Sequence, residues 1–307
     1  MRRVPLASLE VSVIGLGCNN FGRALDAAGS KVVVDAALEA GMNFFDSSDN
    51  YGEAQSEGFL GAALGSRRSE VVIATKFGMP VSGVEGSGGA KPDYIRRAVR
   101  RSLEQLGTDY IDMYQLHKPD PTTPIGDTLE VMWELVEQGV VREIGCSNLD
   151  TAQLGEALEY SAAKGGRVFV SNQIEYSLVN RSIESNGLAE LCRANGVALL
   201  PFYPLASGLL TGKTRRGQTP MGRLIMDRYQ NFLTDRNFDI AEAVEAFAAE
   251  RDITMVQVAL GWLIAQPGVP SVTAGATRVE QVQGNAAAAT WNPTADDLAT
   301  LDAISVA

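Results

Sequence analysis

Short runs of β-branched and aromatic residues alternate with amphipathic segments along the whole chain. The runs typical of strands are SVIGLG, MNFFD, VVIATK, IDMYQLH, VREIGCSN, VFVSNQIEY, VALLPFYP and SVTAG. The segments between them have the apolar spacing of helices that cover one face. Repeated strand-then-helix units are what a (β/α)8 barrel requires.

Two of the intervening segments show the helical pattern clearly. In residues 91–107 the apolar positions fall on one face, with Pro92 suited to the first turn and Gly107 to the C-terminal cap. Residues 123–139 repeat the pattern, and Gly139 closes the predicted helix.

The alternation predicts an α/β fold, a (β/α)8 TIM barrel, over residues 1–307 as one domain, because no linker or composition shift divides the chain. Residues 2–12 predict an N-terminal β-hairpin that closes the barrel floor. Two long loops, 77–91 and 211–239, follow the third and seventh predicted strands. Loops of this length are usually functional or mobile, and we expect both at the C-terminal face.

Charge and cysteine usage narrow the class of protein. The chain has 26 basic and 37 acidic residues and a net charge of −11, which argues against nucleic acid and anionic membranes as partners. Cys18, Cys146 and Cys192 fit neither a disulfide framework nor a metal-ligand spacing, and His117 is the single histidine. No metal site, signal peptide or membrane span is predicted, so we expect a cytoplasmic protein.

Glycines near the N-terminus do not form a dinucleotide-binding fingerprint. In GLGCNNFG, Asn20 occupies the third glycine position of the G-x-G-x-x-G motif. If the chain binds a dinucleotide, it therefore does so by another route.

Polar side chains stand at the predicted C-terminal ends of consecutive strands. These are Asp46, Lys76 and His117, with Tyr51 in the loop after Asp46. Each alone is most often a cap, a packed residue or a solvated side chain. Together at one barrel mouth, where such barrels place their chemistry, the four indicate a site.

A family resemblance supports this interpretation. The segments FFDSSDNYGEAQSEGFLGAAL, VVIATKFG, TDYIDMYQLHKPDP, EIGCSN, NQIEYSL, PLASGLLTGK and AGATRVEQVQGNAAA together resemble the aldo-keto reductases, across essentially the whole chain. The resemblance implies an NAD(P)H-dependent reductase whose catalytic tetrad falls on Asp46, Tyr51, Lys76 and His117.

The proposed chemistry explains these residue types. Tyr51 would give a proton to the carbonyl oxygen, but a phenol with a pKa of about 10 is a poor acid near neutrality. The ammonium of Lys76, paired with Asp46, is expected to lower that pKa. His117 would hydrogen-bond the carbonyl oxygen and orient it.

The resemblance also implies cofactor contacts at the later strands. It places the nicotinamide carboxamide against Ser147, Asn148 and Gln173, although Ser147 and Asn148 alone also suit an N-cap pair before a helix starting near Asp150. Phe202 is expected to stack on the nicotinamide, with Tyr203 as the alternative one position along. The pyrophosphate region is expected to include Leu205, Ser207 and Lys213.

After the last strand, Thr277 and Glu280 have the spacing of a capping box, which predicts a helix N-terminus suited to phosphate. Arg278 would pair with a 2′-phosphate and so favours NADP (NADPH) over NAD, which remains possible. Two cofactor-binding positions depart from the family pattern, since Gly275 stands where many relatives have lysine and Gln281 where many have arginine. Asn285 is expected to contact the adenine.

Three functions remain open. The first is reversible reduction of an aldehyde, ketone or sugar carbonyl in a small-molecule substrate. The second is a cofactor-sensing regulatory or interaction protein with little turnover. The third is a lyase with Lys76 as a Schiff base, against which Asp46 argues by keeping the lysine charged. Ser48 and Ala54, where relatives often have alanine and glycine, are expected to lie outside the chemistry.

Overall fold

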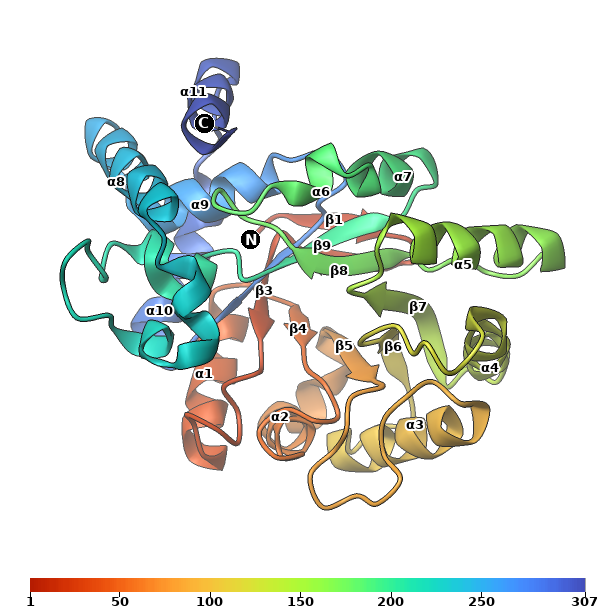
Figure 1. The fold of residues 1–307 in the computed structure, drawn as a ribbon. Coiled ribbons are helices and arrows are strands. Elements are labelled where there is room, and N and C mark those ends of the chain that lie inside the picture. The colour runs from red at the N-terminus through yellow and green to blue at the C-terminus, as the bar shows by residue number, and fades with distance from the viewer. Residues whose placement is uncertain (307) are drawn as a thin grey trace.

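The strands of the structure, a computed structural model that describes residues 1–306, form a nearly closed parallel barrel. Within those residues one eight-stranded sheet has the order β10-β3-β4-β5-β6-β7-β8-β9 (Figure 1). Its strands are β3 Ile14–Gly17, β4 Phe44–Asp46, β5 Val72–Phe77, β6 Ile111–Leu116, β7 Val141–Ser147, β8 Ser171–Glu175, β9 Ala198–Phe202 and β10 Val272–Gly275. At the seam between the edge strands, Thr273 Oγ1 lies 3.5 Å from the carbonyl oxygen of Pro201. The (β/α)8 prediction is confirmed.

Helices surround the sheet on its outer side (Figure 1). Their bounds are α1 Ala27–Glu39, α2 Ser56–Leu64, α3 Pro92–Leu106, α4 Ile125–Glu137, α5 Thr151–Lys164, α6 Ser182–Ser185, α7 Leu188–Ala194, α8 Asp235–Glu250, α9 Met255–Ile264, α10 Val279–Ala287 and α11 Ala295–Val306. Gly107 caps α3 in a left-handed conformation, φ 62°, as predicted. No helix within residues 1–306 combines the length and apolar character needed to cross a bilayer.

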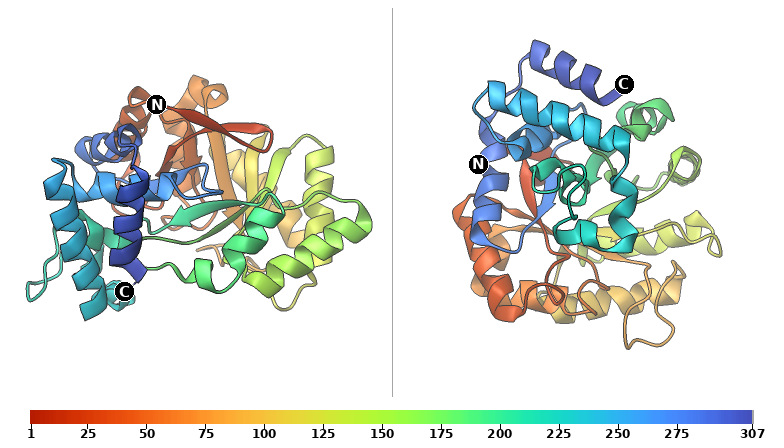
Figure 2. Two further views of the ribbon diagram at one scale, coloured as in Figure 1. Left: turned by 90° about the horizontal axis from the view of Figure 1, so that it is seen from above. Right: turned by 60° about the vertical axis from the view of Figure 1, so that its left-hand side comes forward.

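The N-terminal hairpin covers one end of the barrel. Strands β1 (Arg3–Leu6) and β2 (Leu9–Ser12) pair antiparallel, and Figure 2 shows the hairpin, in red, across the strand ends. Its Val11 packs in a buried cluster with Phe44 and Met113, which point into the barrel from β4 and β6. The hairpin therefore fills the barrel floor with apolar side chains, as predicted.

Side chains along each strand alternate between the barrel interior and the surrounding helices. The apolar floor cluster contains Phe44, Ala74 and Met113. Two residues further along the same strands and the same face come Asp46, Lys76 and Gln115. The period of two thus places these polar side chains inside the barrel, one layer nearer the C-terminal end.

The loop after β9 contains more regular structure than its sequence predicts. It holds the short 3-10 helices η2 (Ala206–Thr211), η3 (Gly222–Ile225) and η4 (Asp227–Phe232). Helix α8 then begins at Asp235, because the Thr234 side chain accepts a hydrogen bond from Asn237 N and caps it. The expectation that the loop extends to residue 239 is therefore wrong by one helical turn. Two further 3-10 segments are η1 Gly65–Glu70 and η5 Ala288–Thr290.

Candidate active site

The polar segment after β4 folds into the barrel mouth instead of projecting into solvent. Ser48 and Asp49 are each 1% exposed, and Ser47 is fully buried. A backbone hydrogen bond of 3.2 Å from Tyr51 N to the Ser48 carbonyl closes a turn that brings the tyrosine back over the strand ends. Buried polar groups need partners, and those partners define the site.

Lys76 and Asp46 form a buried ion pair. The Lys76 ammonium donates to both Asp46 carboxylate oxygens at 2.7 Å and to the Ser47 carbonyl at 2.8 Å, and Lys76 has no exposed surface. Gln115 Nε2 donates to Asp46 Oδ1 at 3.3 Å. Burial alone would lower the pKa of Lys76, but the Asp46 carboxylate and its hydrogen bonds raise it above its usual value, so the lysine stays charged.

Tyr51 lies beside this charged pair. The Lys76 ammonium is 5.2 Å from the centroid of the Tyr51 ring. Burial raises the pKa of the Tyr51 phenol, and the lowering effect of Lys76 only partly offsets it. The expected lowering effect of Lys76 is present, but burial outweighs it, and the net shift of the Tyr51 pKa is upward. Near neutrality Tyr51 holds its proton.

The His117 ring completes the group. It meets the Tyr51 ring edge-on, with centroids 5.7 Å apart and an interplanar angle of 79°. Burial, followed by the charges of Lys76 and Lys118, lowers the pKa of His117 to about 3, so the ring is neutral. Ser48 Oγ lies 3.0 Å from His117 Nδ1. The expectation that Ser48 lies outside this cluster is wrong.

Ser147, Asn148 and Gln173 adjoin the same cluster. Asn148 Nδ2 donates to the His117 carbonyl at 3.0 Å and to Ser147 Oγ at 2.9 Å, and Ser147 Oγ donates to the Gln173 carbonyl at 2.9 Å. Asp150 caps α5 through a capping box with Gln153, so the N-cap alternative for Ser147 and Asn148 is wrong. Within residues 1–306, buried Gln173 Nε2 has no hydrogen-bond partner.

The aromatic pair at the end of β9 divides between two environments. Phe202 follows the inward-facing Leu200 by two residues and so faces the barrel mouth. Tyr203, at φ 51°, packs edge-on against Tyr229 and Phe232, with ring centroids 5.8 and 5.9 Å away, and against Phe202, with centroids 5.1 Å apart. The loop after β9 thus packs on Tyr203 and leaves Phe202 beside the mouth.

The loop after β9 also carries the residues expected near a pyrophosphate. Ser207 adopts φ 56°, and its buried Oγ has no partner within residues 1–306. Leu205 is half-buried, and Lys213 is exposed. A strained backbone that aims an unpaired hydroxyl is typical of a ligand-binding loop.

The loop after β10 differs from its predicted capping. Arg278, exposed, is the N-cap of α10 and makes no side-chain capping bond, so the capping box of Thr277 and Glu280 is wrong. Gln281 Oε1 instead accepts from Thr277 N at 2.7 Å and from Thr277 Oγ1 at 3.0 Å. Gly275 is exposed, and Asn285 is buried on α10.

These features fit a nicotinamide dinucleotide. Gln173 Nε2 offers a donor for a carboxamide oxygen, and Ser207 Oγ offers a partner for a phosphate oxygen. The uncapped first turn of α10 presents backbone N–H groups to an anion. Gln173 lies in β8, Ser207 lies in the loop after β9, and the first turn of α10 follows β10.

Several residues outside the predicted set hold this site together. Gln115 supports Asp46, and it stands two residues before His117, so strand periodicity was a usable signal. Arg223 donates to Asn19 Oδ1 at 2.8 Å and Asn20 Oδ1 at 2.6 Å, joining the loop after β9 to the loop after β3. No sequence pattern signals that contact between loops so far apart in the chain.

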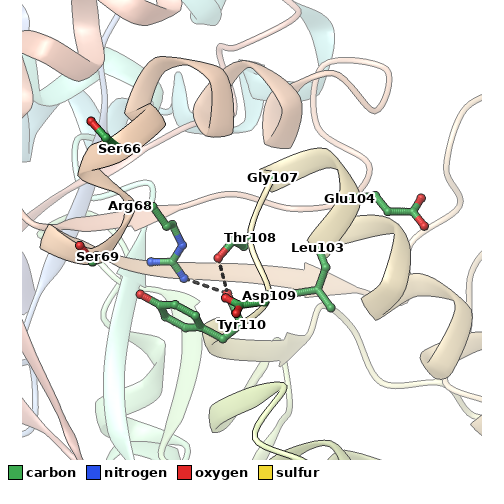
Figure 3. A pocket seen from close by; sticks show the side chains of 9 residues that line it. All are labelled: Ser66, Arg68, Ser69, Leu103, Glu104, Gly107, Thr108, Asp109 and Tyr110. Atoms are coloured by element: carbon green, nitrogen blue, oxygen red, sulfur yellow. Dashed lines mark hydrogen bonds between the residues drawn. The ribbon is translucent and has the colours of Figure 1, made fainter.

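A separate depression lies at the opposite end of the strands. It has a volume of about 690 Å³ and is lined by η1 and by the loop between α3 and β6 (Figure 3). Its Arg68 is already engaged, by the Asp112 carboxylate at 2.8 Å and the Tyr110 carbonyl at 3.0 Å. The chemistry-bearing side chains described above are therefore not part of this depression.

Comparison with known proteins shows the family to which the chain belongs. The model of the aldo/keto reductase family matches residues 13–306. A probable voltage-gated potassium channel subunit beta of Oryza sativa subsp. japonica is 32% identical over 288 residues, 91% of this chain and 88% of that protein. An NADH-specific methylglyoxal reductase of Escherichia coli (strain K12) is 33% identical, covering 95% of this chain and 94% of that protein. An L-glyceraldehyde 3-phosphate reductase of the same organism is 29% identical, covering 91% and 84%.

Proposed function

Since the chain belongs to the aldo/keto reductase family, an oxidoreductase family, we propose that it reversibly reduces an aldehyde, ketone or sugar carbonyl to the alcohol. The proposed hydride donor is NADPH, and the proposed proton donor is Tyr51. The observation that carries the proposal is the buried Lys76–Asp46 pair beside Tyr51 and His117.

Each of the four side chains has a separate proposed role at the carbonyl oxygen. Tyr51 keeps its proton until negative charge develops on that oxygen, because burial holds its pKa high. As the proton leaves, the ammonium of Lys76 stabilises the forming phenolate. Asp46 keeps Lys76 charged and fixed, and neutral His117 offers a ring nitrogen to the same oxygen.

A bound nicotinamide cofactor would supply the hydride. Ser147, Asn148 and Gln173 would hold its carboxamide, and Phe202 would stack on the ring. The phosphates would contact Ser207, Lys213 and the first turn of α10. We propose NADP over NAD because exposed Arg278 lies at the N-cap position of that turn and can pair with a 2′-phosphate, although one relative is named as NADH-specific.

Replacement of Tyr51 by phenylalanine tests the proton-donor role. Tyr51→Phe removes the acidic proton and keeps the ring, so kcat for carbonyl reduction should fall by a factor of at least about 10², the low end of a general-acid contribution. The dissociation constant for NADPH, followed by fluorescence titration, should change little. Turnover at the wild-type rate in this variant would exclude Tyr51 as the donor.

A second candidate function is cofactor sensing with little turnover. Plant relatives that cover most of this chain are named as probable potassium channel β subunits, which favours a regulatory role. Tight binding of NADPH, with no oxidation of the bound cofactor when many different carbonyl compounds are added, would support it. Multiple turnovers with a simple aldehyde would exclude it as the main function.

A further inference from the structure

Ser48 connects the active-site imidazole to a second side chain. Its Oγ lies 3.0 Å from His117 Nδ1, 2.8 Å from Asn50 Oδ1 and 3.5 Å from Asp49 Oδ1. Ser48 is 1% exposed, so its hydroxyl bonds to protein groups rather than to bulk water. A hydroxyl carries one proton and can also accept, so Ser48 can link His117 and Asn50 in a directed chain.

The direction of that chain decides what His117 presents to a substrate. A neutral imidazole carries one N–H, and the hydrogen bond at one nitrogen selects the tautomer at the other. If Ser48 donates to Nδ1, the proton of His117 resides on Nε2. If Ser48 accepts from Nδ1–H, Nε2 is left with a lone pair that repels a carbonyl oxygen.

We propose that Ser48 is a positioning residue that donates its hydroxyl proton to His117 Nδ1 and so fixes the tautomer with Nε2–H facing the substrate oxygen. The direction of donation rests on the proposed function, because a carbonyl oxygen needs a hydrogen-bond donor at Nε2. No other donor to Nδ1 is present among residues 1–306.

Asn50 sets the direction of donation. As an acceptor, its Oδ1 competes with His117 Nδ1 for the Ser48 proton. A half-turn of the Asn50 amide places Nδ2–H on Ser48 Oγ instead, and every donor in the chain Asn50, Ser48, His117 then faces an acceptor. An amide at position 50 can adopt this arrangement, whereas a carboxylate cannot, because an ionised carboxylate only accepts.

The tautomer is directly measurable because His117 is the single histidine of the chain. Nitrogen NMR of the protein labelled with ¹⁵N-histidine should show protonated Nε2 and unprotonated, hydrogen-bonded Nδ1. Ser48→Ala should give a mixture of tautomers, and Ser48→Thr, which keeps a hydroxyl, should restore the wild-type spectrum. Protonated Nδ1 in the wild type, or a Ser48→Ala spectrum identical to it, would overturn the proposal.

Asn50→Asp tests the direction of the chain. The carboxylate should accept the hydrogen bond of the Ser48 hydroxyl. Ser48 Oγ would then accept from His117, whose proton should move to Nδ1. In this variant and in Ser48→Ala, kcat for carbonyl reduction should fall about tenfold, the rate equivalent of one hydrogen bond, with NADPH binding unchanged. An unchanged tautomer in Asn50→Asp would overturn the role of Asn50.

The spectra separate this proposal from the proposed function. The spectra require no turnover. If the protein reduced no carbonyl but its spectrum changed in Ser48→Ala as predicted, only the reductase assignment would be contradicted. If the enzyme were active but the ¹⁵N spectrum of His117 did not change in Ser48→Ala, only the positioning role would be contradicted.

Discussion

Asp49 is a carboxyl group buried behind the active-site loop. Tyr94 OH donates to its Oδ2 at 3.2 Å, and Arg101 lies 3.4 Å from the same oxygen. Burial first, and then the Glu57 carboxylate, raise the pKa of Asp49 to about 7, against the partial opposition of Arg101. Burial also raises the pKa of Glu57. The two carboxyl groups therefore resist ionisation together.

This shift predicts how stability depends on pH. The unfolded carboxyl titrates near ~3.9, so between about pH 4 and pH 7 the folded protein holds a proton that the unfolded chain has lost. The free energy of unfolding should therefore fall as pH rises through this window, and the loss should be complete above about pH 7.

An amide in place of the Asp49 carboxyl cannot ionise and should flatten that slope. From pH 5 to pH 7.5, the free energy of unfolding of Asp49→Asn should rise by on the order of 2 kcal/mol relative to that of the wild type, as measured by urea unfolding. Exposed Asp93→Asn on α3 serves as the control and should keep the wild-type slope. Equal slopes in the wild type and Asp49→Asn would show that Asp49 is ionised throughout.

Residue types at strand ends were predictable, and the energetics between them were not. Asp46, Lys76 and His117 follow from strand endings and period-two alternation. The raised pKa of Tyr51 was missed because burial, which the sequence does not show, outweighs the visible charge of Lys76. Ser48 was dismissed because its contact with His117 spans 69 residues of chain.

At the level of elements, α2 and α3 pack unusually closely. A Cβ on Gly61 of α2 would lie 2.4 Å from the Leu106 carbonyl oxygen at the end of α3. That oxygen belongs to the backbone and cannot move aside without shifting the helix. Glycine at this position therefore sets the distance between the two helices.

Two matched glycines in the same helix test this. Gly61→Ala should lower the free energy of unfolding by about 1–3 kcal/mol, the usual cost of overpacking. In Gly58→Ala the closest contact of the added Cβ would be the flexible end of Gln105, at 3.0 Å, so the gain in helix propensity should leave stability equal or higher. Chemical denaturation of both variants distinguishes them, and equal losses would contradict the close-packing account.

Element boundaries were predictable where local signals act alone. Pro92 and Gly107 bound α3 as expected. The start of α10 was not predicted correctly, because Gln281, one turn into the helix, takes the hydrogen bonds of Thr277 that a capping box would have used. Likewise η4 packs on Tyr203 through Tyr229 and Phe232, and no local pattern in the loop reveals that contact.

For the whole molecule, the barrel brings the C-terminal ends of β4 to β10, and loops that follow them, to one mouth. The loop after β4 supplies the proposed proton donor, and β4 and β5 supply its charged support. The proposed cofactor contacts come from β7, β8 and β9 and from the loops that follow β7, β9 and β10. The hairpin β1–β2 and the floor cluster close the other end, so access is from the C-terminal side. The proposed proton donor and the proposed cofactor contacts therefore face the same opening, as carbonyl reduction at a bound nicotinamide requires.

The most direct test is the loss of reduced-nicotinamide absorbance with a reactive aromatic aldehyde, with NADPH and NADH in parallel. We expect multiple turnovers and a higher kcat/KM with NADPH. In Arg278→Ala that preference should fall by about tenfold or more, because one charge-assisted phosphate contact is lost. Equal rates with both cofactors would contradict the role of Arg278. No oxidation of either bound cofactor across a panel of aldehydes, ketones and sugars would contradict the reductase itself.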